Sequence, residues 1–243
     1  MRHLHIVMPM AGEGSRFKKE GWATPKPLIE LNGKPLFLHA ISSVAAPGIE
    51  LKYSFIVRQE HIKEYEIDKG IKNILPKANI FSVAKTTRGA VETCLVAESA
   101  IADDDAVIVM DCDLEFRSKK FLEIILSILK QPVDFAEGGA LVSFQSTDPR
   151  YSYAALGENG YVTKTAEKEP ISNHALCGAY FFSTGKRFKQ VAHQLLNEPE
   201  FKKPEYYVSL LYNYLLKAGE KVQLASMEEY YSYGTPEELK RYL

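Results

Sequence analysis

The sequence is poor in cysteine, has no long hydrophobic run and carries almost no net charge. Its three cysteines, Cys94, Cys112 and Cys177, lie far apart, and none forms a C-x-x-C pair. An odd number of separated cysteines indicates free thiols in a reducing compartment. No apolar run approaches the ~18 residues of a membrane-spanning helix, and the apolar stretch after Met1–His5 is too short for a secretory signal. We therefore expect a cytoplasmic protein without a membrane segment.

The charge balance argues against partners that bind by bulk electrostatics. The 243 residues include 30 basic and 31 acidic side chains, for a formal net charge of −1. No global field therefore favours nucleic acid or an anionic membrane. Repeats, linkers and low-complexity stretches are also absent, and 46% hydrophobic residues are typical of a globular chain. The sequence predicts one domain over residues 1–243 and leaves an oligomer open.

Strand and helix patterns alternate along the first half of the chain. Strands are expected at 4–10, 53–57, 79–83 and 106–110, and helices at 36–44, 61–75 (broken) and 90–100. Pro35 is expected at the first helical position, and Asp103-Asp104-Asp105 as a solvated turn. The second half predicts helices at 121–129, 188–196 and 206–216, a strand at 138–144, and a hairpin turning at Asn159-Gly160. This pattern predicts an α/β fold with a Rossmann-like, doubly wound, mostly parallel (mixed) sheet covered by helices on both faces.

The first strand leads into a loop suited to phosphate, Ala11-Gly12-Glu13-Gly14-Ser15-Arg16. Two glycines let a substrate approach the backbone, whose amides can converge on an anionic oxygen. A plain turn would explain the glycines alone. Arg16 adds a planar guanidinium, and Lys26, within Pro25-Lys26-Pro27-Leu28, adds a compact positive charge. Two cations and a ring of amides favour a polyphosphate ligand.

Two commoner glycine motifs do not fit this loop. A Rossmann fingerprint needs a third glycine where Phe17 stands and a helix that starts at once, and residues 18–22 do not open a helix convincingly. A P-loop needs Gly-Lys-Ser/Thr, which is absent. The loop therefore belongs to another class of phosphate-binding motif.

Two aspartates follow the fully apolar strand 106–110. Asp111 and Asp113 are predicted at its carboxyl end, where ligands bind in open α/β sheets. A strand-end turn is the plainer explanation, but carboxylates two residues apart suit a hard divalent cation that substrate phosphates also hold. Without a cation, two buried carboxylates would repel each other.

GEGSRF followed by PKPL resembles the signature of the sugar-phosphate nucleotidyltransferases, the nucleoside-diphosphate-sugar pyrophosphorylases. The resemblance extends along the chain and implies a GT-A-like nucleotidyltransferase fold. It also implies transfer of a nucleoside monophosphate from an NTP to a sugar 1-phosphate, with release of pyrophosphate and help from Mg²⁺. The nucleotide-binding part would be about 1–116, and the sugar-phosphate-binding part about 117–243.

The same resemblance implies roles for residues further along the chain. Asp113, followed two residues on by the aromatic Phe116, matches the metal aspartate, with Asp111 as a helper. Gly89, Ala90 and Thr93 sit where the family contacts the base, although small residues also serve close helix packing. Lys168 would hold the acceptor phosphate. The residues implied in sugar binding are Glu167, Asn173, Gly178 and Tyr180. Gly139, near the start of a predicted strand, is a further candidate, because a glycine suits close approach of a sugar.

One position departs from the family pattern. Ser232-Tyr233-Gly234-Thr235-Pro236-Glu237-Glu238-Leu239 resembles the family's D-x-G-T-P-E-x-L, but Ser232 stands where the family commonly has its second metal aspartate. Because a hydroxyl is a poorer ligand for a hard cation than a carboxylate, we expect a weakened metal site.

Three rival functions remain at this stage. A cytidylyltransferase acting on a non-sugar phosphate, such as phosphocholine or a phosphonate, would use the same loops with another acceptor pocket. A GT-A glycosyltransferase also carries an Asp-x-Asp, but it would not need the GEGSRF and PKPL loops. Ser232 alone suggests a catalytically weak nucleotide-binding protein.

Overall fold

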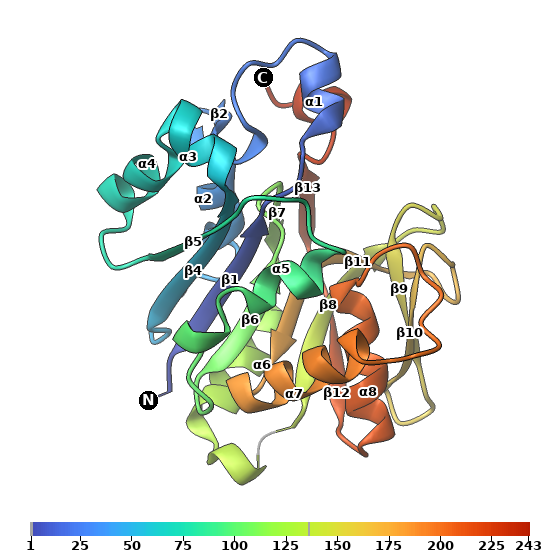
Figure 1. Ribbon diagram of the computed structural model, residues 1–243. Coiled ribbons are helices and arrows are strands. Elements are labelled where there is room, and N and C mark those ends of the chain that lie inside the picture. Colours follow the sequence, from blue (N-terminus) through green and yellow to red (C-terminus); the bar gives the residue numbers. More distant parts are fainter. Residues whose placement is uncertain (1, 136) are drawn as a thin grey trace.

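The computed structural model describes residues 2–135 and 137–243 (Figure 1). The strands of its main sheet are β1 (Leu4–Met10), β4 (Leu51–Arg58), β5 (Asn79–Val83), β6 (Ala106–Met110), β8 (Gly139–Gln145), β9 (Ser152–Leu156), β10 (Val162–Glu167), β11 (His174–Phe182) and β12 (Val222–Ser226). Two small ladders pair β7 (Leu114–Arg117) with β13 (Glu229–Ser232), and β2 (Glu30–Leu31) with β3 (Lys34–Pro35). The helices are α1 (Ser15–Lys19), α2 (Leu36–Ser42), α3 (Gln59–Tyr65), α4 (Ile67–Ile74), α5 (Ala90–Leu95), α6 (Lys119–Lys130), α7 (Gly185–Leu196), α8 (Leu211–Lys217) and α9 (Pro236–Leu239).

The sheet is mixed and contains nine strands within the described residues. Its order is β10-β9-β11-β6-β1-β4-β5, with β8 paired to β11 and β12. β6, β1, β4 and β5 run parallel, while β11 is antiparallel to β6. The chain moves outward from β1 to β5 and then returns to the other side of β1 as β6. The carboxyl ends of β1 and β6 therefore form the topological switch point, where open α/β sheets bind ligands.

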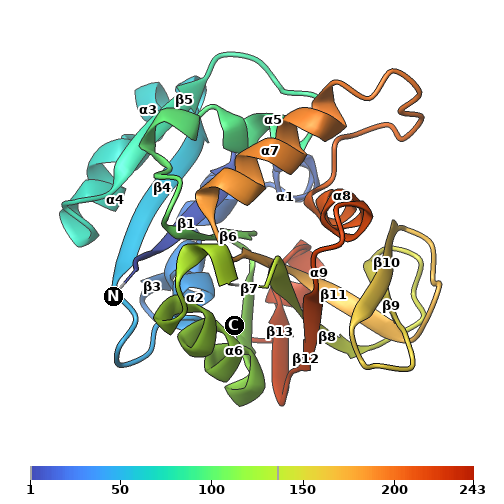
Figure 2. The same cartoon turned by 90° about the horizontal axis from the view of Figure 1, so that it is seen from below.

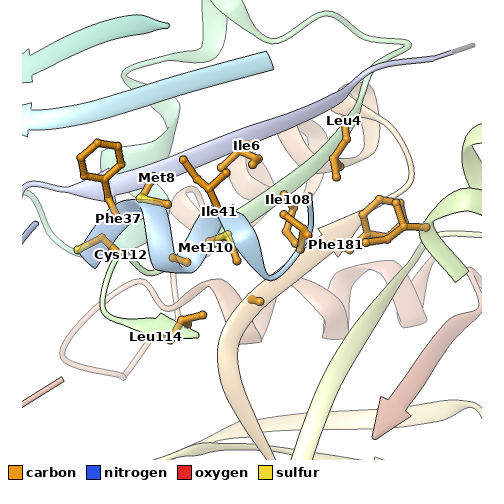
Figure 3. Packing of buried hydrophobic residues seen from close by; sticks show 14 of the residues in the cluster. Leu4, Ile6, Met8, Phe37, Ile41, Ile108, Met110, Cys112, Leu114 and Phe181 are labelled. Atoms are coloured by element: carbon orange, nitrogen blue, oxygen red, sulfur yellow. The ribbon is translucent and has the colours of Figure 1, made fainter. Parts of the chain in front are cut away.

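Helices cover both faces of this sheet (Figure 2). Side chains alternate along β1: Leu4, Ile6 and Met8 pack into a cluster with α2, α4 and α6, and Val7 packs into another with α5, α7 and α8. Figure 3 shows the first cluster, where Phe37 of α2 lies beside the β1 side chains. The predicted doubly wound α/β fold is confirmed, because a strand buried on both faces needs a helix layer on each side.

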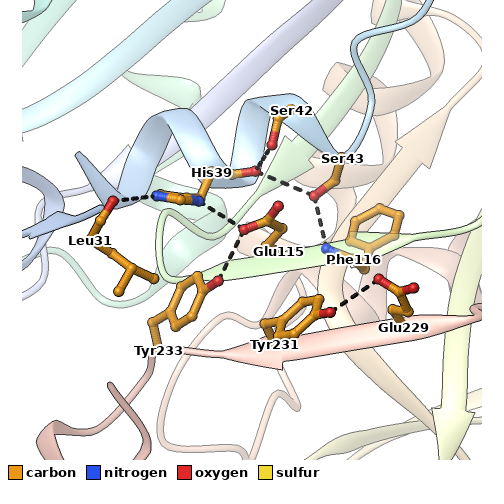
Figure 4. A network of polar contacts seen from close by, with 9 residues as sticks. All are labelled: Leu31, His39, Ser42, Ser43, Glu115, Phe116, Glu229, Tyr231 and Tyr233. Atoms are coloured by element: carbon orange, nitrogen blue, oxygen red, sulfur yellow. Dashed lines mark hydrogen bonds and ion pairs between the residues drawn. The ribbon is translucent and has the colours of Figure 1, made fainter. Parts of the chain in front are cut away.

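A polar network fixes the segment that follows β6 (Figure 4). His39 Nδ1 of α2 lies 2.8 Å from Glu115 Oε2 of β7, and Tyr233 donates its hydroxyl to the same oxygen at 3.0 Å. The Tyr233 amide donates to the Asp113 carbonyl at 2.8 Å. These bonds hold the end of β13 beside the turn that contains Asp113.

Several predicted elements need correction. Residues 15–19 form the short helix α1, since Phe17 is buried and packs edge-on against Trp22 at 5.7 Å between ring centroids. Pro35 is the residue before α2 instead of its first helical residue. The expected helix at 90–100 ends at Leu95 and gives way to a 3₁₀ turn at Glu98–Ala100. Tertiary contacts thus override local preference at each of these ends.

Two further expectations differ from the structure because residues pair with distant segments of the chain. Asp105 is buried instead of solvated, because Lys52 of β4 places its Nζ 2.7 Å from the Asp105 carboxylate. The expected helix at 206–216 begins with a 3₁₀ turn at Val208–Leu210 and becomes α-helical at Leu211. Tyr206 instead exchanges backbone hydrogen bonds with Arg88 and Val91. No helix in residues 2–135 and 137–243 is long and apolar enough to cross a membrane.

Candidate active site

A cleft of about 440 Å³ opens at the switch point of the sheet. Segments from the whole chain meet there: the N-terminal loop and α1, the turn after β6, the β9–β10 hairpin, β11, and the segment from β13 to α9. The predicted site residues that line it are Arg16, Lys26, Ala90, Asp111, Asp113, Glu167, Lys168, Gly178, Tyr180 and Ser232. Residues separated by more than 200 positions thus share one cavity.

The glycine loop after β1 is open to a ligand. Gly14 adopts a left-handed conformation (φ 61°) just before α1, which favours glycine. A Cβ atom at Gly12 or Gly14 would meet no other atom within 4 Å, so packing does not require either glycine. Ser15 begins α1 and is exposed, while Ala11 is buried and its carbonyl accepts from Arg58 at 3.4 Å. Gly12 and Gly14 line a neighbouring hollow, not the cleft itself, so anion binding by this loop stays a prediction.

Lys26 is the cation at the centre of the cleft. Buried Pro25 and Pro27 hold it in a 3₁₀ turn (Lys26–Leu28), and its Nζ lies 2.6 Å from Asp113 Oδ2. Burial lowers the pKa of Lys26, but the Asp113 carboxylate raises it more, so the net pKa lies above the ordinary value. The ammonium is therefore charged at neutral pH, as a contact with phosphate oxygens would require.

Asp111 has the most perturbed carboxylate in the cleft. The Asp111 side chain is exposed to the open cleft, yet desolvation by the surrounding protein and repulsion by Asp113 raise its pKa to about 7 against the opposing effect of Lys26. Its amide donates to the Gly178 carbonyl at 2.9 Å. One ammonium thus faces two carboxylates, and further positive charge would stabilise both in the ionised form.

The residues present fit a divalent cation that keeps some of its water ligands. Within the described parts of the chain, no group of three or more His, Cys, Asp or Glu side chains is arranged to hold a metal ion. Mg²⁺ commonly takes one or two carboxylates and completes its shell with water and substrate phosphates. Asp113 and Asp111 therefore form a donor set suited to such an ion, but not a closed protein cage.

The other side of the cleft contains Glu167 and Lys168. The Glu167 carboxylate is buried and accepts hydrogen bonds from Ser152 and, at 2.8 Å, from Ser209. Lys168 has a positive φ of 57° and donates from Nζ to the Tyr207 hydroxyl at 3.0 Å. This hydrogen bond raises the pKa of Lys168. β10, which ends just before Lys168, is separated from β1 by β9, β11 and β6, so this ammonium comes from a different part of the sheet than the glycine loop after β1.

β11 contributes Gly178 and Tyr180. Gly178 has a φ of +92°, and a Cβ there would lie 2.4 Å from Asp111 Oδ2. Close approach of the carboxylate therefore requires glycine. The Tyr180 hydroxyl lies 3.4 Å from Ser152 Oγ, which ties the tyrosine to the group around Glu167.

The predicted base-contact residues divide into two groups. Ala90 lines the cleft. Gly89 is packed against the backbone of Tyr206, where an added Cβ would approach to 2.5 Å. Thr93 is buried and its hydroxyl donates to the Gly89 carbonyl at 3.0 Å. Gly89 and Thr93 thus serve the close helix packing that their small size also suggested.

Two predicted sugar-binding residues lie outside the cleft. Gly139 starts β8 at the opposite end of the sheet, where it pairs with Phe182, and a Cβ there would lie 2.2 Å from the Phe181 carbonyl. Asn173 is exposed before β11, and its carbonyl accepts from Ser146. The small size of Gly139 serves strand packing, so both residues are removed from the expected sugar site.

Sequence reasoning missed Arg150, Tyr151, Tyr207, Tyr230 and Glu238, all of which line the cleft. A cluster of C-terminal tyrosines is visible in the sequence, but helix and sheet packing explains such a cluster equally well. No sequence signal marks Arg150 or Glu238, because their loops meet only in the folded chain.

A cleft at the switch point of a doubly wound sheet, lined by both cationic and acidic side chains, is where nucleotide-binding α/β proteins hold their ligand. A family model described as nucleotidyl transferase matches residues 5–231, and the chain belongs to that family. The resemblance to sugar-phosphate nucleotidyltransferases is thereby confirmed at the level of the family.

Solved structures share the fold. A nucleoside-diphosphate-sugar pyrophosphorylase from Vibrio cholerae RC9 superposes with a TM-score of 0.82 and 26% identity, covering 99% of both chains. An inositol-1-phosphate CTP transferase from T. maritima covers 99% of this chain and 94% of its own, with a TM-score of 0.72 and 16% identity. At that identity the second likeness shows the nucleotidyltransferase fold alone.

Curated relatives match over part of their length. A 2-C-methyl-D-erythritol 4-phosphate cytidylyltransferase of Chromobacterium violaceum is 36% identical over 107 residues, 43% of this chain and 44% of its own. A mannose-1-phosphate guanyltransferase of Gibberella zeae is 27% identical over 190 residues, 72% of this chain and 48% of its own. The matched part thus spans less than half of each of these relatives. The names of these two relatives specify different nucleotide bases and different phosphorylated acceptors.

Proposed function

We propose that the protein transfers a nucleoside monophosphate from an NTP to a sugar 1-phosphate, giving an NDP-sugar and pyrophosphate. The observation that carries this proposal is the convergence of Arg16, Lys26, Asp113 and Lys168 in one cleft. The glycine loop directly precedes Arg16 in the chain, and Lys168 follows β10 at the other side of the sheet order from β1. Residues 1–116 would serve the nucleotide and 117–243 the sugar phosphate, in the cytoplasm where the three free, buried thiols would stay reduced.

The residue types match the chemistry of this transfer. A sugar 1-phosphate is close to a dianion at neutral pH, because its second pKa lies near ~6. It therefore needs positioning and charge neutralisation instead of a general base. Lys168 would hold the attacking phosphate, while Arg16 and Lys26 would neutralise charge on the transferring and leaving phosphates. Glu167, Gly178 and Tyr180 would contact the acceptor.

Mg²⁺ bound by Asp113 and Asp111 would supply positive charge to the phosphates of the NTP. Lys26 Nζ lies 2.6 Å from Asp113 Oδ2, so a cation bound at Asp113 would release the ammonium to contact phosphate. A divalent cation at Asp113 would also lower the raised pKa of Asp111, since added positive charge favours the ionised form of its carboxylate.

A second candidate is a cytidylyltransferase that acts on a non-sugar phosphate, such as phosphocholine or a phosphonate. Tyr151, Tyr207 and Tyr230 line the acceptor side of the cleft, and aromatic faces attract cationic groups. The similarity to a cytidylyltransferase for a polyol phosphate also favours this candidate. A catalytically weak nucleotide-binding protein is the third candidate, suggested only by Ser232.

A matrix of NTPs against acceptors distinguishes these candidates. The four common NTPs and dTTP are each incubated with sugar 1-phosphates, phosphocholine and a phosphonate in the presence of Mg²⁺, and pyrophosphate is measured. Pyrophosphate release that depends on a sugar 1-phosphate supports the proposal, and release that depends on phosphocholine or a phosphonate supports the second candidate. If no acceptor gives pyrophosphate release, the third candidate is supported.

The same assay with Lys26→Ala shows whether the activity belongs to this cleft. Removing the ammonium should lower turnover by at least about 100-fold, because a buried charge that neutralises the transferring phosphates is lost. Lys18→Ala, which removes an exposed lysine paired with Glu60, is the matched control and should retain activity. A Lys26→Ala enzyme with wild-type turnover would exclude Lys26 from the mechanism.

A further inference from the structure

A carboxylate from α9 lies beside Ser232, the position that lacks the family's aspartate. Ser232 Oγ donates to Glu238 Oε2 at 2.8 Å. Ser232 ends β13 opposite Leu114, so both side chains lie next to the turn that holds Asp113. The missing carboxylate at position 232 is thus accompanied by a carboxylate six residues later in the sequence.

Gly234 leaves a small space among three oxygen atoms. A Cβ at Gly234 would lie 3.3 Å from Asp113 Oδ2, 3.4 Å from Glu238 Oε2 and 3.7 Å from Ser232 Oγ. All four residues line the cleft, so this space is continuous with the site already described. Two carboxylate oxygens and a hydroxyl oxygen thus lie close together beside Gly234, and a hard cation prefers oxygen donors of this kind.

Glu238 is held rigidly in this position. It lies in the four-residue helix α9, whose preceding residue Thr235 accepts the Glu238 amide at 3.2 Å. Its side chain is only 9% exposed, and its Oε1 pairs with Arg150 Nη1 at 2.6 Å. A buried carboxylate needs such a counterion. Arg150 itself is half-exposed, and its guanidinium also pairs with Asp148 and lies over the Tyr151 ring.

We propose that Glu238, together with Asp113, supplies the second carboxylate of the divalent-cation site, and that Ser232 orients it. Lys26 pairs with Asp113 and Arg150 pairs with Glu238, so each carboxylate has a protein counterion. A bound cation would take over that role. The proposal rests on the cation dependence of the proposed function, and it makes Glu238 the replacement for the carboxylate that position 232 lacks.

Binding of Mn²⁺ alone to the full chain tests this assignment without any substrate. The free ion is measured by electron paramagnetic resonance in wild type, Glu238→Gln and Glu237→Gln. We expect at least about tenfold weaker binding for Glu238→Gln, because even indirect contacts to a bound metal change its affinity by that amount. Glu237 is highly exposed and pairs with Arg241, so Glu237→Gln should bind Mn²⁺ like wild type.

Two further variants separate a ligand from a structural residue. Ser232→Asp in the Glu238→Gln background returns a carboxylate to the site and should restore most of the affinity. Arg150→Gln removes the competing cation but keeps Glu238, and should tighten Mn²⁺ binding. If the Glu238–Arg150 pair only supported the structure, Arg150→Gln would weaken Mn²⁺ binding, because loss of the pair would loosen the site.

Several results would overturn the proposal. They are wild-type Mn²⁺ affinity in a folded Glu238→Gln protein, no Mn²⁺ binding by wild type, and unchanged or weaker binding in Arg150→Gln. Circular dichroism checks folding, and if Glu238→Gln does not fold, the Arg150→Gln result decides. Pyrophosphate release by wild type tests the proposed function independently, so the assignment of Glu238 can fail while the enzyme activity stands.

Discussion

Gly178 places the backbone of β11 directly against the Asp111 carboxylate. A residue with a Cβ would there combine a left-handed backbone with a contact of 2.4 Å to Asp111 Oδ2. We expect Gly178→Ala to lower the free energy of unfolding by about 2 kcal/mol or more, and to reduce turnover because Asp111 must move. Urea unfolding and the pyrophosphate assay measure the two effects.

Gly219 offers a matched control for this substitution. It has a similar positive φ of +80°, but a Cβ there would meet nothing within 4 Å. Gly219→Ala should therefore cost only the backbone strain, about 1 kcal/mol, and leave turnover unchanged. If Gly178→Ala and Gly219→Ala lowered the free energy of unfolding equally, the contact with Asp111 would contribute nothing to the destabilisation.

At the scale of elements, β1 and β4 are linked by a buried histidine. His5 Nε2 lies 2.9 Å from Ser54 Oγ, and its Nδ1 has no hydrogen-bond partner among the described residues. The pKa of His5 is lowered to about 4, chiefly by burial and to a smaller extent by Lys52 and His3, while Asp105 opposes the shift. The imidazole is therefore neutral in the folded state over most of the range in which it would protonate in the unfolded chain.

This shift predicts a loss of stability in acid. Between the unfolded pKa near ~6.5 and the folded value, the unfolded state binds more protons, so the free energy of unfolding falls as pH falls through this window. The contribution of His5 is at most roughly 3 kcal/mol. His5→Gln should reduce the stability difference between pH 7 and pH 5, measured by urea unfolding. If His5→Gln and wild type lost the same free energy of unfolding between pH 7 and pH 5, the lowered pKa of His5 would be contradicted.

The elements themselves were predictable where their pattern does not depend on distant partners. Strands 4–10, 79–83 and 106–110 are observed with the expected bounds, and the apolar runs of 4–10 and 106–110 are typical of central parallel strands. Helix ends were less predictable. The short helix at 15–19 depends on the contact of Phe17 with Trp22, and the late start of α8 depends on the backbone pairing of Tyr206.

At the scale of the whole molecule, the cleft is built by both ends of the chain. A ligand that contacts the N-terminal loop, the β9–β10 hairpin and the segment from β13 to α9 would bind only the folded state. The preferred NTP with Mg²⁺, at about 100 times its Kd, should stabilise the protein by about 2.7 kcal/mol. For a chain of this size the melting temperature should rise by roughly 5–10 °C.

A thermal melt with each NTP measures this shift, and it should agree with the base preference found by the pyrophosphate assay. Replacing Mg²⁺ by EDTA should reduce the shift, because the phosphates would then lose the cation held by the carboxylates. An NTP that is turned over rapidly at saturating concentration but leaves the melting temperature unchanged would contradict this account.

The sequence by itself determined the doubly wound fold and the catalytic candidates that sit in short motifs. Arg16, Lys26, Asp111 and Asp113 could be found in this way, because strand ends and glycine loops place them locally. Only the tertiary structure decided which remote residues join them. Glu238 faces Asp113, and Gly139 lies at the far end of the sheet, because strand order and direction are set by packing between segments far apart in the chain.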